Sequence, residues 1–181
     1  MKTPLTYGVF LALASCLLTL VLYFGGFHSD STKFHTAELI GNIANPILSI
    51  IFICLAMRTA RQERPLGEPY GYGSALGTGV LTALTGALII AIFGVIYSKF
   101  INPNFVDVLI ESKVAQMQAQ GKPQQMIDGA EKFMHMMFNP AVQLLVGIIF
   151  GTVFGTIISL IAAIFFRRKT TDLPPEAPLA A

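Results

Sequence analysis

The chain has 181 residues, of which 54% are hydrophobic and only 12% are charged, whereas a soluble domain carries about 25% charged residues. Its net charge of +2 is too small for a nucleic-acid-binding surface. This composition excludes an ordinary soluble domain and indicates a single integral membrane domain, with no room for a separate catalytic domain.

Four segments contain no charged residue and are long enough to cross a bilayer, which takes about 20 apolar residues. They span residues 3–29, 39–57, 69–98 and 133–166. We expect helices at about 4–27, 38–58, 71–98 and 140–166. The sequence therefore predicts an all-α, integral membrane four-helix bundle over residues 1–169. Residues 170–181, rich in proline and alanine, are expected to form a disordered cytoplasmic tail.

Every arginine follows the second or the fourth of these segments. The five are Arg58, Arg61, Arg64, Arg167 and Arg168. Short arginine-rich segments remain in the cytoplasm, so both termini are expected to be cytoplasmic in a bacterial inner membrane, with residues 99–139 outside. The tyrosines agree, since they fall at the expected helix ends, where aromatic rings prefer the headgroup region. They are Tyr7, Tyr70 and Tyr72 at the inner boundary, and Tyr23 and Tyr97 at the outer one.

Few polar side chains lie within the expected helices. Asn42, Asn45 and Gln143 form a candidate intramembrane polar site, either as interhelical hydrogen bonds or as a solute pocket. No Asp, Glu, Lys or Arg is expected near the bilayer centre, which disfavours a proton-coupled carrier. We find no catalytic constellation and expect no catalytic residue, no cofactor and no metal site.

The third and fourth helices carry small residues at intervals of four, which places them on one face of each helix. These helix-packing residues are Ala75, Gly79, Ala83, Ala87 and Ala91 on the third, and Gly147, Gly151, Gly155 and Ser159 on the fourth. Such stripes let membrane helices approach closely. We expect them to pack within one chain, and a homo-oligomer contact through the fourth helix is the alternative.

The long outer segment is predicted to be an amphipathic helical hairpin over residues 103–138, broken at Gly121-Lys122-Pro123. Five of the seven methionines fall in this segment, and methionine-rich faces adapt to varied partners. The apolar faces are expected to pack on each other, on the lipid bilayer or on another membrane protein. A copper site over 134–137 is disfavoured, because contiguous helical residues point in different directions.

The chain resembles the bacterial membrane proteins grouped as domain of unknown function 4199. The resemblance rests on Tyr70-Gly71-Tyr72-Gly73-Ser74-Ala75-Leu76-Gly77-Thr78-Gly79 and on Tyr97-Ser98-Lys99-Phe100-Ile101-Asn102-Pro103-Asn104-Phe105, and it covers residues from about 5 to 169. What it implies is an integral membrane protein with no assigned activity.

Together these features predict a non-enzymatic inner-membrane protein that acts by oligomerisation or as a helper subunit of an envelope complex. The alternative is an oligomeric small-solute transporter or channel subunit, for which four helices are few and no inverted repeat is visible. The expected partners are the lipid bilayer and a homo-oligomer or other membrane protein at the outer hairpin. Nucleic acid is not an expected partner.

Overall fold

The computed structural model describes residues 2–29, 31–65 and 68–167, and these residues form helices without any strand. The four long helices are α1 (Lys2–Phe24), α2 (Ser31–Gln62), α3 (Tyr72–Ile96) and α6 (Pro140–Phe166). Each is long and apolar enough to cross a membrane. The prediction of an all-α protein with four helices long and apolar enough to span a membrane is therefore confirmed for the described residues, and these helices suggest a multi-pass membrane protein. The expected tail at 170–181 lies outside the described residues.

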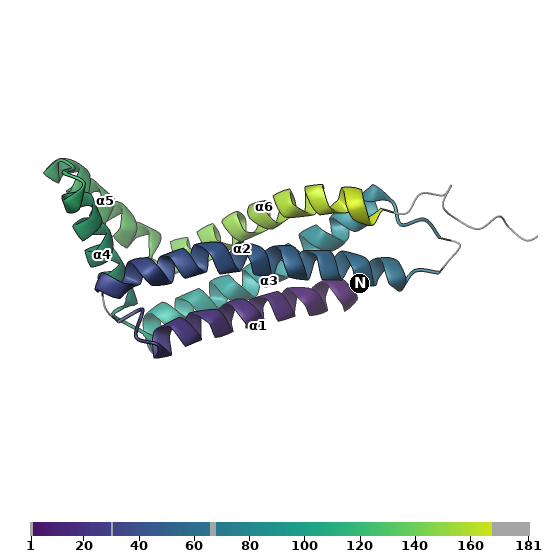
Figure 1. The fold of residues 1–181 in the computed structure, drawn as a ribbon, viewed down its shortest axis with the longest axis horizontal. Coiled ribbons are helices and arrows are strands. Elements are labelled where there is room, and N and C mark those ends of the chain that lie inside the picture. The colour runs from purple at the N-terminus through teal and green to yellow at the C-terminus, as the bar shows by residue number, and fades with distance from the viewer. Residues whose placement is uncertain (1, 30, 66–67, 168–181) are drawn as a thin grey trace, which may run out of the picture.

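The four long helices run side by side, and a helical hairpin stands at one end of them (Figure 1). The hairpin consists of α4 (Phe105–Ala119) and α5 (Gln124–Met137), joined through Gly121 in a left-handed conformation (φ +67°). We call this end the hairpin end. The start of α1 and the end of α6 lie at the opposite end, which we call the terminal end.

Helix α2 is longer than the sequence predicted, since it begins at Ser31 rather than near residue 38 and ends at Gln62. Hydropathy detects only the segment that lipid can surround. The extra turns at the hairpin end carry polar residues, but Phe34 and Ala37 within them are buried against the rest of the protein. Packing therefore continues the helix beyond its uncharged segment.

A π-helical turn, η1 (Tyr97–Ile101), follows α3 directly. The backbone N–H of Asn102 donates to the Tyr97 carbonyl at 2.8 Å, a bond that spans five residues instead of four. The expected helix end at residue 98 was therefore three residues short. This turn leads the chain into the hairpin, and Asn139 caps the start of α6 through its side-chain oxygen, which accepts from Ala141 N–H at 3.2 Å.

The small-residue stripes of α3 and α6 face each other. A Cβ atom built on Gly147 would lie 3.1 Å from Ala91 Cβ, and one on Gly151 would lie 2.8 Å from Ala87 Cβ. Nearer the terminal end, Gly155 meets Ala83 in the same way. Gly79 meets Ser159 and Ala75 is fully buried. The two backbones thus approach within one chain, along most of both helices.

Two of the five tyrosines do not lie in a lipid headgroup belt as expected. Tyr70 and Tyr97 are 1% and 3% exposed and are enclosed by protein. Tyr70 donates a hydrogen bond to Thr78 Oγ1 at 2.9 Å, and the Arg64 guanidinium lies 5.3 Å from its ring centre. Burial raises the pKa of Tyr70. The expectation considered only the position of a tyrosine in the chain, and neighbouring helices decide whether its ring reaches lipid.

Candidate functional site

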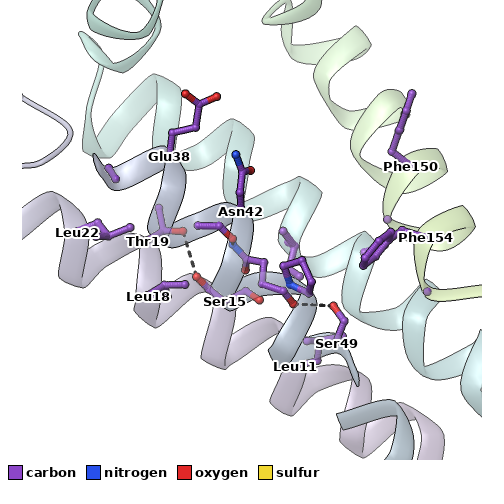
Figure 2. Close-up of a pocket in the computed structure, with 18 of the residues that line it drawn as sticks. Leu11, Ser15, Leu18, Thr19, Leu22, Glu38, Asn42, Ser49, Phe150 and Phe154 are labelled. Atoms are coloured by element: carbon purple, nitrogen blue, oxygen red, sulfur yellow. Dashed lines mark hydrogen bonds between the residues drawn. The ribbon is translucent and has the colours of Figure 1, made fainter. Parts of the chain in front are cut away.

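A cavity of about 660 Å³ lies between α1, α2, α3 and α6 in the half of the molecule nearer the hairpin end. We call it the lateral cavity. Figure 2 shows Asn42 and Ser49 on α2 and Phe150 and Phe154 on α6, on opposite sides of it. Its volume falls within the range of about 300–1,000 Å³ that is usual for small-molecule sites.

One face of α2 lines the lateral cavity with polar side chains. They are Glu38, Asn42, Asn45 and Ser49, and we call them the polar stripe. Their spacing of four, three and four residues places them in one row along the helix. Asn42 and Asn45 are exposed although they belong to a membrane-spanning helix. Polar groups exposed within a bilayer need hydrogen-bonding partners, so the stripe sets this surface apart from a lipid-facing one.

Asn42 has the greatest unused hydrogen-bonding capacity in the stripe. Asn45 donates to the Gly41 carbonyl at 3.0 Å and Ser49 donates to the Asn45 carbonyl at 2.9 Å. The Asn42 side chain, by contrast, finds no hydrogen-bond partner among the residues that the structure describes. Pro46 lacks the N–H that would bond the Asn42 carbonyl in the helical ladder. The side-chain amide of Asn42 is therefore available on the cavity side, and its backbone carbonyl lacks the helical bond that residue 46 would otherwise supply.

Glu38 lies at the end of the polar stripe nearest the hairpin, where Lys113 of α4 holds it. Lys113 Nζ donates to both carboxylate oxygens at 2.6 Å, and the two side chains are about one-third exposed, at 32% and 30%. His35 Nδ1 lies 3.9 Å from the same carboxylate. The ion pair neutralises Glu38 and attaches α4 over the cavity, where Phe105 and Leu109 also line it.

His28 adjoins the cavity within a cluster of aromatic rings. Its Nδ1 lies 2.6 Å from the Tyr97 hydroxyl, and its ring centre is 5.3 Å from Phe105 and 5.7 Å from Phe34. We call these four residues the aromatic junction. Asn102 Nδ2 donates to the Tyr97 hydroxyl oxygen at 3.4 Å and to the His28 carbonyl at 3.3 Å, which ties the end of the π-helical turn to the same cluster.

Burial lowers the pKa of His28, which favours its uncharged form. A histidine that follows a membrane-spanning segment is usually solvated, but His28 is only 7% exposed. The junction joins the α1–α2 loop, α2, η1 and α4, and these elements are far apart in the sequence. A single chain offers no signal for such a cluster before its elements are placed.

The lateral cavity is closed toward the terminal end. Ile53 and Met57 of α2 are fully buried and pack in the same core as Ala83 of α3. A Cβ atom on Gly155 would lie 3.6 Å from Ile53 Cδ1, so α2 and α6 meet here. The cavity consequently ends partway along the helices and does not form a continuous channel through the described part of the chain.

The structure brings only two of the three predicted intramembrane polar residues together. Asn42 and Asn45 line the lateral cavity, whereas Gln143 is not among its lining residues. Gln143 Oε1 accepts a hydrogen bond from Ser98 Oγ at 3.3 Å and so joins α6 to the end of α3. Glu38, which is the first residue of the expected helix 38–58 but lies outside its uncharged segment, belongs to the same row as the two asparagines.

No group of three or more His, Cys, Asp or Glu side chains in the described chain is arranged to hold a metal ion. On α5, His135 and Met136 are both exposed and Met134 is half-buried. The residues of the 134–137 segment therefore differ in their surroundings. The lateral cavity is thus a site of hydrogen-bonding and apolar groups.

The chain was compared with known proteins. The family described as "protein of unknown function (DUF4199)" matches residues 6–168, which include all four long helices almost completely and the whole hairpin. Neither a curated protein nor a solved structure matches the chain. A match over this share of the sequence establishes the relationship suggested by the glycine- and tyrosine-rich start of α3, and the chain belongs to the DUF4199 family.

Proposed function

We propose that this protein is a non-enzymatic binding subunit of the bacterial inner membrane that holds a small molecule in the lateral cavity. Its four long helices form a bundle, with both termini in the cytoplasm and the hairpin outside. The observation that carries the proposal is the polar stripe, which exposes Asn42 and Asn45 to a cavity of ligand size within membrane-spanning helices. A closed end at Ile53 and Met57 favours binding over conduction.

Filling the cavity is expected to abolish this binding. Gly41 lines the cavity, and a Cβ atom there would meet only Asn45 Nδ2, at 3.7 Å. Gly41→Leu therefore adds volume to the cavity without a clash at its Cβ, and leucine favours the helix more than glycine by about 1 kcal/mol. Native mass spectrometry of protein purified in mild detergent should show a small-molecule adduct on the wild type that Gly41→Leu lacks.

The matched control is Gly73→Leu, because Gly73 also lies in a membrane-spanning helix with nothing within 4 Å of its Cβ position, but not in the cavity lining. This variant should retain the adduct. Equal occupancy in Gly41→Leu and the wild type, with both proteins folded, would contradict the proposal. Absence of any adduct from the wild type would contradict it as well.

A second function, association through the hairpin, is favoured by the surface of α5. Ile127 is buried against the rest of the protein, whereas three large apolar side chains on the same helix are about half exposed. They are Met126, Phe133 and Met136, at 55%, 56% and 53%. We propose that this face, the α5 apolar face, contacts another membrane protein or a second copy of this chain, which makes the protein a helper subunit of an envelope complex.

Cysteine labelling tests both the hairpin contact and the orientation. In a background with Cys16 and Cys54 replaced, Lys122→Cys in the hairpin turn should react with a membrane-impermeant thiol reagent in intact cells. Phe133→Cys should be protected there but should react at least severalfold faster in nanodiscs that contain a single copy of this protein and lipid, because neither another membrane protein nor a second copy is then present.

Each of the two labelled positions can contradict a different part of the proposal. If Lys122→Cys reacts only after permeabilisation, the proposed orientation is wrong. If Phe133→Cys reacts as fast as Lys122→Cys in cells, no partner covers the α5 apolar face. Protection of Phe133→Cys in nanodiscs as well as in cells would assign this face to lipid instead of to a protein.

A further inference from the structure

Among its described residues, the lateral cavity carries one charged group, at the hairpin end, and the polar stripe continues along its α2 wall as far as Ser49, whereas its other walls are largely apolar. Toward the hairpin it presents Glu38, Asn42 and Thr19. Toward the middle of the membrane its walls are Leu11, Ala83 and Phe154, and Ile53 closes it. A lipid in the leaflet on the hairpin side has the same arrangement, with its headgroup toward the membrane surface and its chain toward the bilayer centre.

The depth of the cavity also matches one leaflet. The spanning part of α2 runs from Lys33 to Gln62, so Asn45 and Ser49 lie near its middle. The cavity extends from Glu38, close to the hairpin end, to Ile53, about one and a half helical turns beyond this midpoint, so most of it lies on the hairpin side. An occupant therefore lies along one leaflet and does not need to cross the membrane.

The rim on α6 is open to the hydrocarbon region. Phe150 and Phe154 line the cavity (Figure 2) and remain 71% and 45% exposed, so the rest of the protein does not cover this wall. Over the hairpin end, α4 covers the cavity and is attached there by Lys113. A molecule can thus reach the cavity sideways, from the bilayer, without displacing α4.

The charge at the polar end indicates the kind of headgroup. Glu38 is the one charged side chain among the described lining residues, and Lys113 neutralises it at 2.6 Å. Burial lowers the pKa of His28, which favours its uncharged form. An unpaired ionic headgroup would therefore lose its hydration without gaining a counter-charge, whereas Asn42 offers hydrogen bonds to a neutral or zwitterionic one.

We infer that the lateral cavity takes an amphiphile from the surrounding bilayer, with its hydrocarbon chain against α1, α3 and α6 and a headgroup of no net charge hydrogen-bonded at Asn42. This inference rests on the proposed binding function and specifies its ligand class. The hydrocarbon chain lies along the apolar walls and reaches toward the closed end at Ile53. The headgroup meets the side-chain amide of Asn42, which makes no hydrogen bond within the described chain.

Photocrosslinking with defined lipids tests the inference. The full-length protein is placed in phosphatidylcholine nanodiscs that contain a monoacyl phosphoethanolamine with a diazirine in its chain. Crosslinks should map to residues 41–53 of α2 and 150–155 of α6, at least fivefold above Gly41→Leu and equal to Gly73→Leu. The same chain on a phosphoglycerol headgroup, which carries a net negative charge, should label these residues severalfold less. Soluble glycerophosphoethanolamine without a chain should not compete.

Asn42→Leu tests the headgroup contact separately. Asn42 is exposed and makes no hydrogen bond within the described chain, so this variant should fold normally. It should keep the chain crosslinks to α6 but lose about fivefold in labelling by the zwitterionic probe, the change expected for about one hydrogen bond. Retention of full labelling and headgroup preference in Asn42→Leu would overturn the assignment of the headgroup to this residue.

The failure of this inference is distinguishable from the failure of the proposed function. If Gly41→Leu is labelled as strongly as the wild type, the probe samples only the outer lipid-facing surface and the inference is wrong. If the wild type carries a Gly41-dependent adduct but soluble glycerophosphoethanolamine competes with it, the ligand comes from water and only the binding function stands. Equal labelling by the two headgroups would overturn the charge selectivity.

Discussion

Gly155→Ala is expected to destabilise the folded protein by about 1–3 kcal/mol, although it adds a single methyl group. The added Cβ would overlap Ala83 Cβ, and Gly155 is buried on the α3–α6 contact. Neither methyl group can rotate away, because a Cβ atom is fixed by the backbone. The two helices would have to separate, and the contacts of neighbouring residues along both stripes would loosen with them.

Exchanging the two residues, so that the methyl group lies on α6 and not on α3, tests whether the overlap with Ala83 causes the loss of stability. Ala83→Gly combined with Gly155→Ala should recover most of the stability lost in Gly155→Ala alone, a coupling that a double-mutant cycle measures by thermal unfolding in detergent. Gly77→Ala is the control, since nothing lies within 4 Å of its Cβ position. If Gly155→Ala melts like the wild type but has a smaller assembly mass, the stripe on α6 is an oligomer contact.

Tyr97→Ala should destabilise the hairpin end by about 3–5 kcal/mol, as is usual for loss of a large buried ring. The ring is 3% exposed and touches Tyr23, His28, Phe93 and Phe105, with ring centres 5.2–6.0 Å apart. Its loss would release α4 from the α1–α2 loop. Limited proteolysis between α4 and α5, together with thermal unfolding, should show this release.

Tyr97→Phe separates the hydrogen bond from the packing. It keeps the ring but leaves His28 Nδ1 and Asn102 Nδ2 without the hydroxyl, which should cost about 1–3 kcal/mol. Phe100→Ala is the control, because Phe100 belongs to the same π-helical turn but is 79% exposed. Similar proteolysis of Tyr97→Ala and Phe100→Ala would show that the aromatic junction does not hold α4.

The membrane-spanning helices could be predicted because lipid imposes length and polarity on each one separately. The bounds of α2 could not, because Phe34 and Ala37 extend the helix through contacts with other elements. The π-helical turn at Tyr97 likewise depends on a backbone bond to Asn102 that composition does not reveal. Local physics thus determined which segments are helical, and tertiary packing determined where they end.

The polar wall of the lateral cavity, which α2 provides, could have been recognised from helical spacing alone. Glu38, Asn42, Asn45 and Ser49 follow a helical row, but the row was hidden because the uncharged segment begins after Glu38. Which side chains of α6 face the polar stripe depends on how α6 is rotated about its own axis. In the structure that rotation turns Gln143 toward Ser98 and away from the cavity. Helix rotation follows from the packing of all four helices together and is not encoded in the period of any one of them.

The contrast between the two kinds of helix contact has a mechanical consequence. Glycine and alanine bring the backbones of α3 and α6 into close contact. The two helices therefore cannot easily shift along each other and are expected to move as one rigid unit. The half of α2 nearer the terminal end packs tightly against this unit through Ile53 and Met57. Pro46 removes a backbone hydrogen bond from α2 on the hairpin side of these contacts, and α2 therefore bends most easily at this position. A small bend of α2 at Pro46 would move its half nearer the hairpin end and change the width of the opening of the lateral cavity, without changing the contact between α3 and α6.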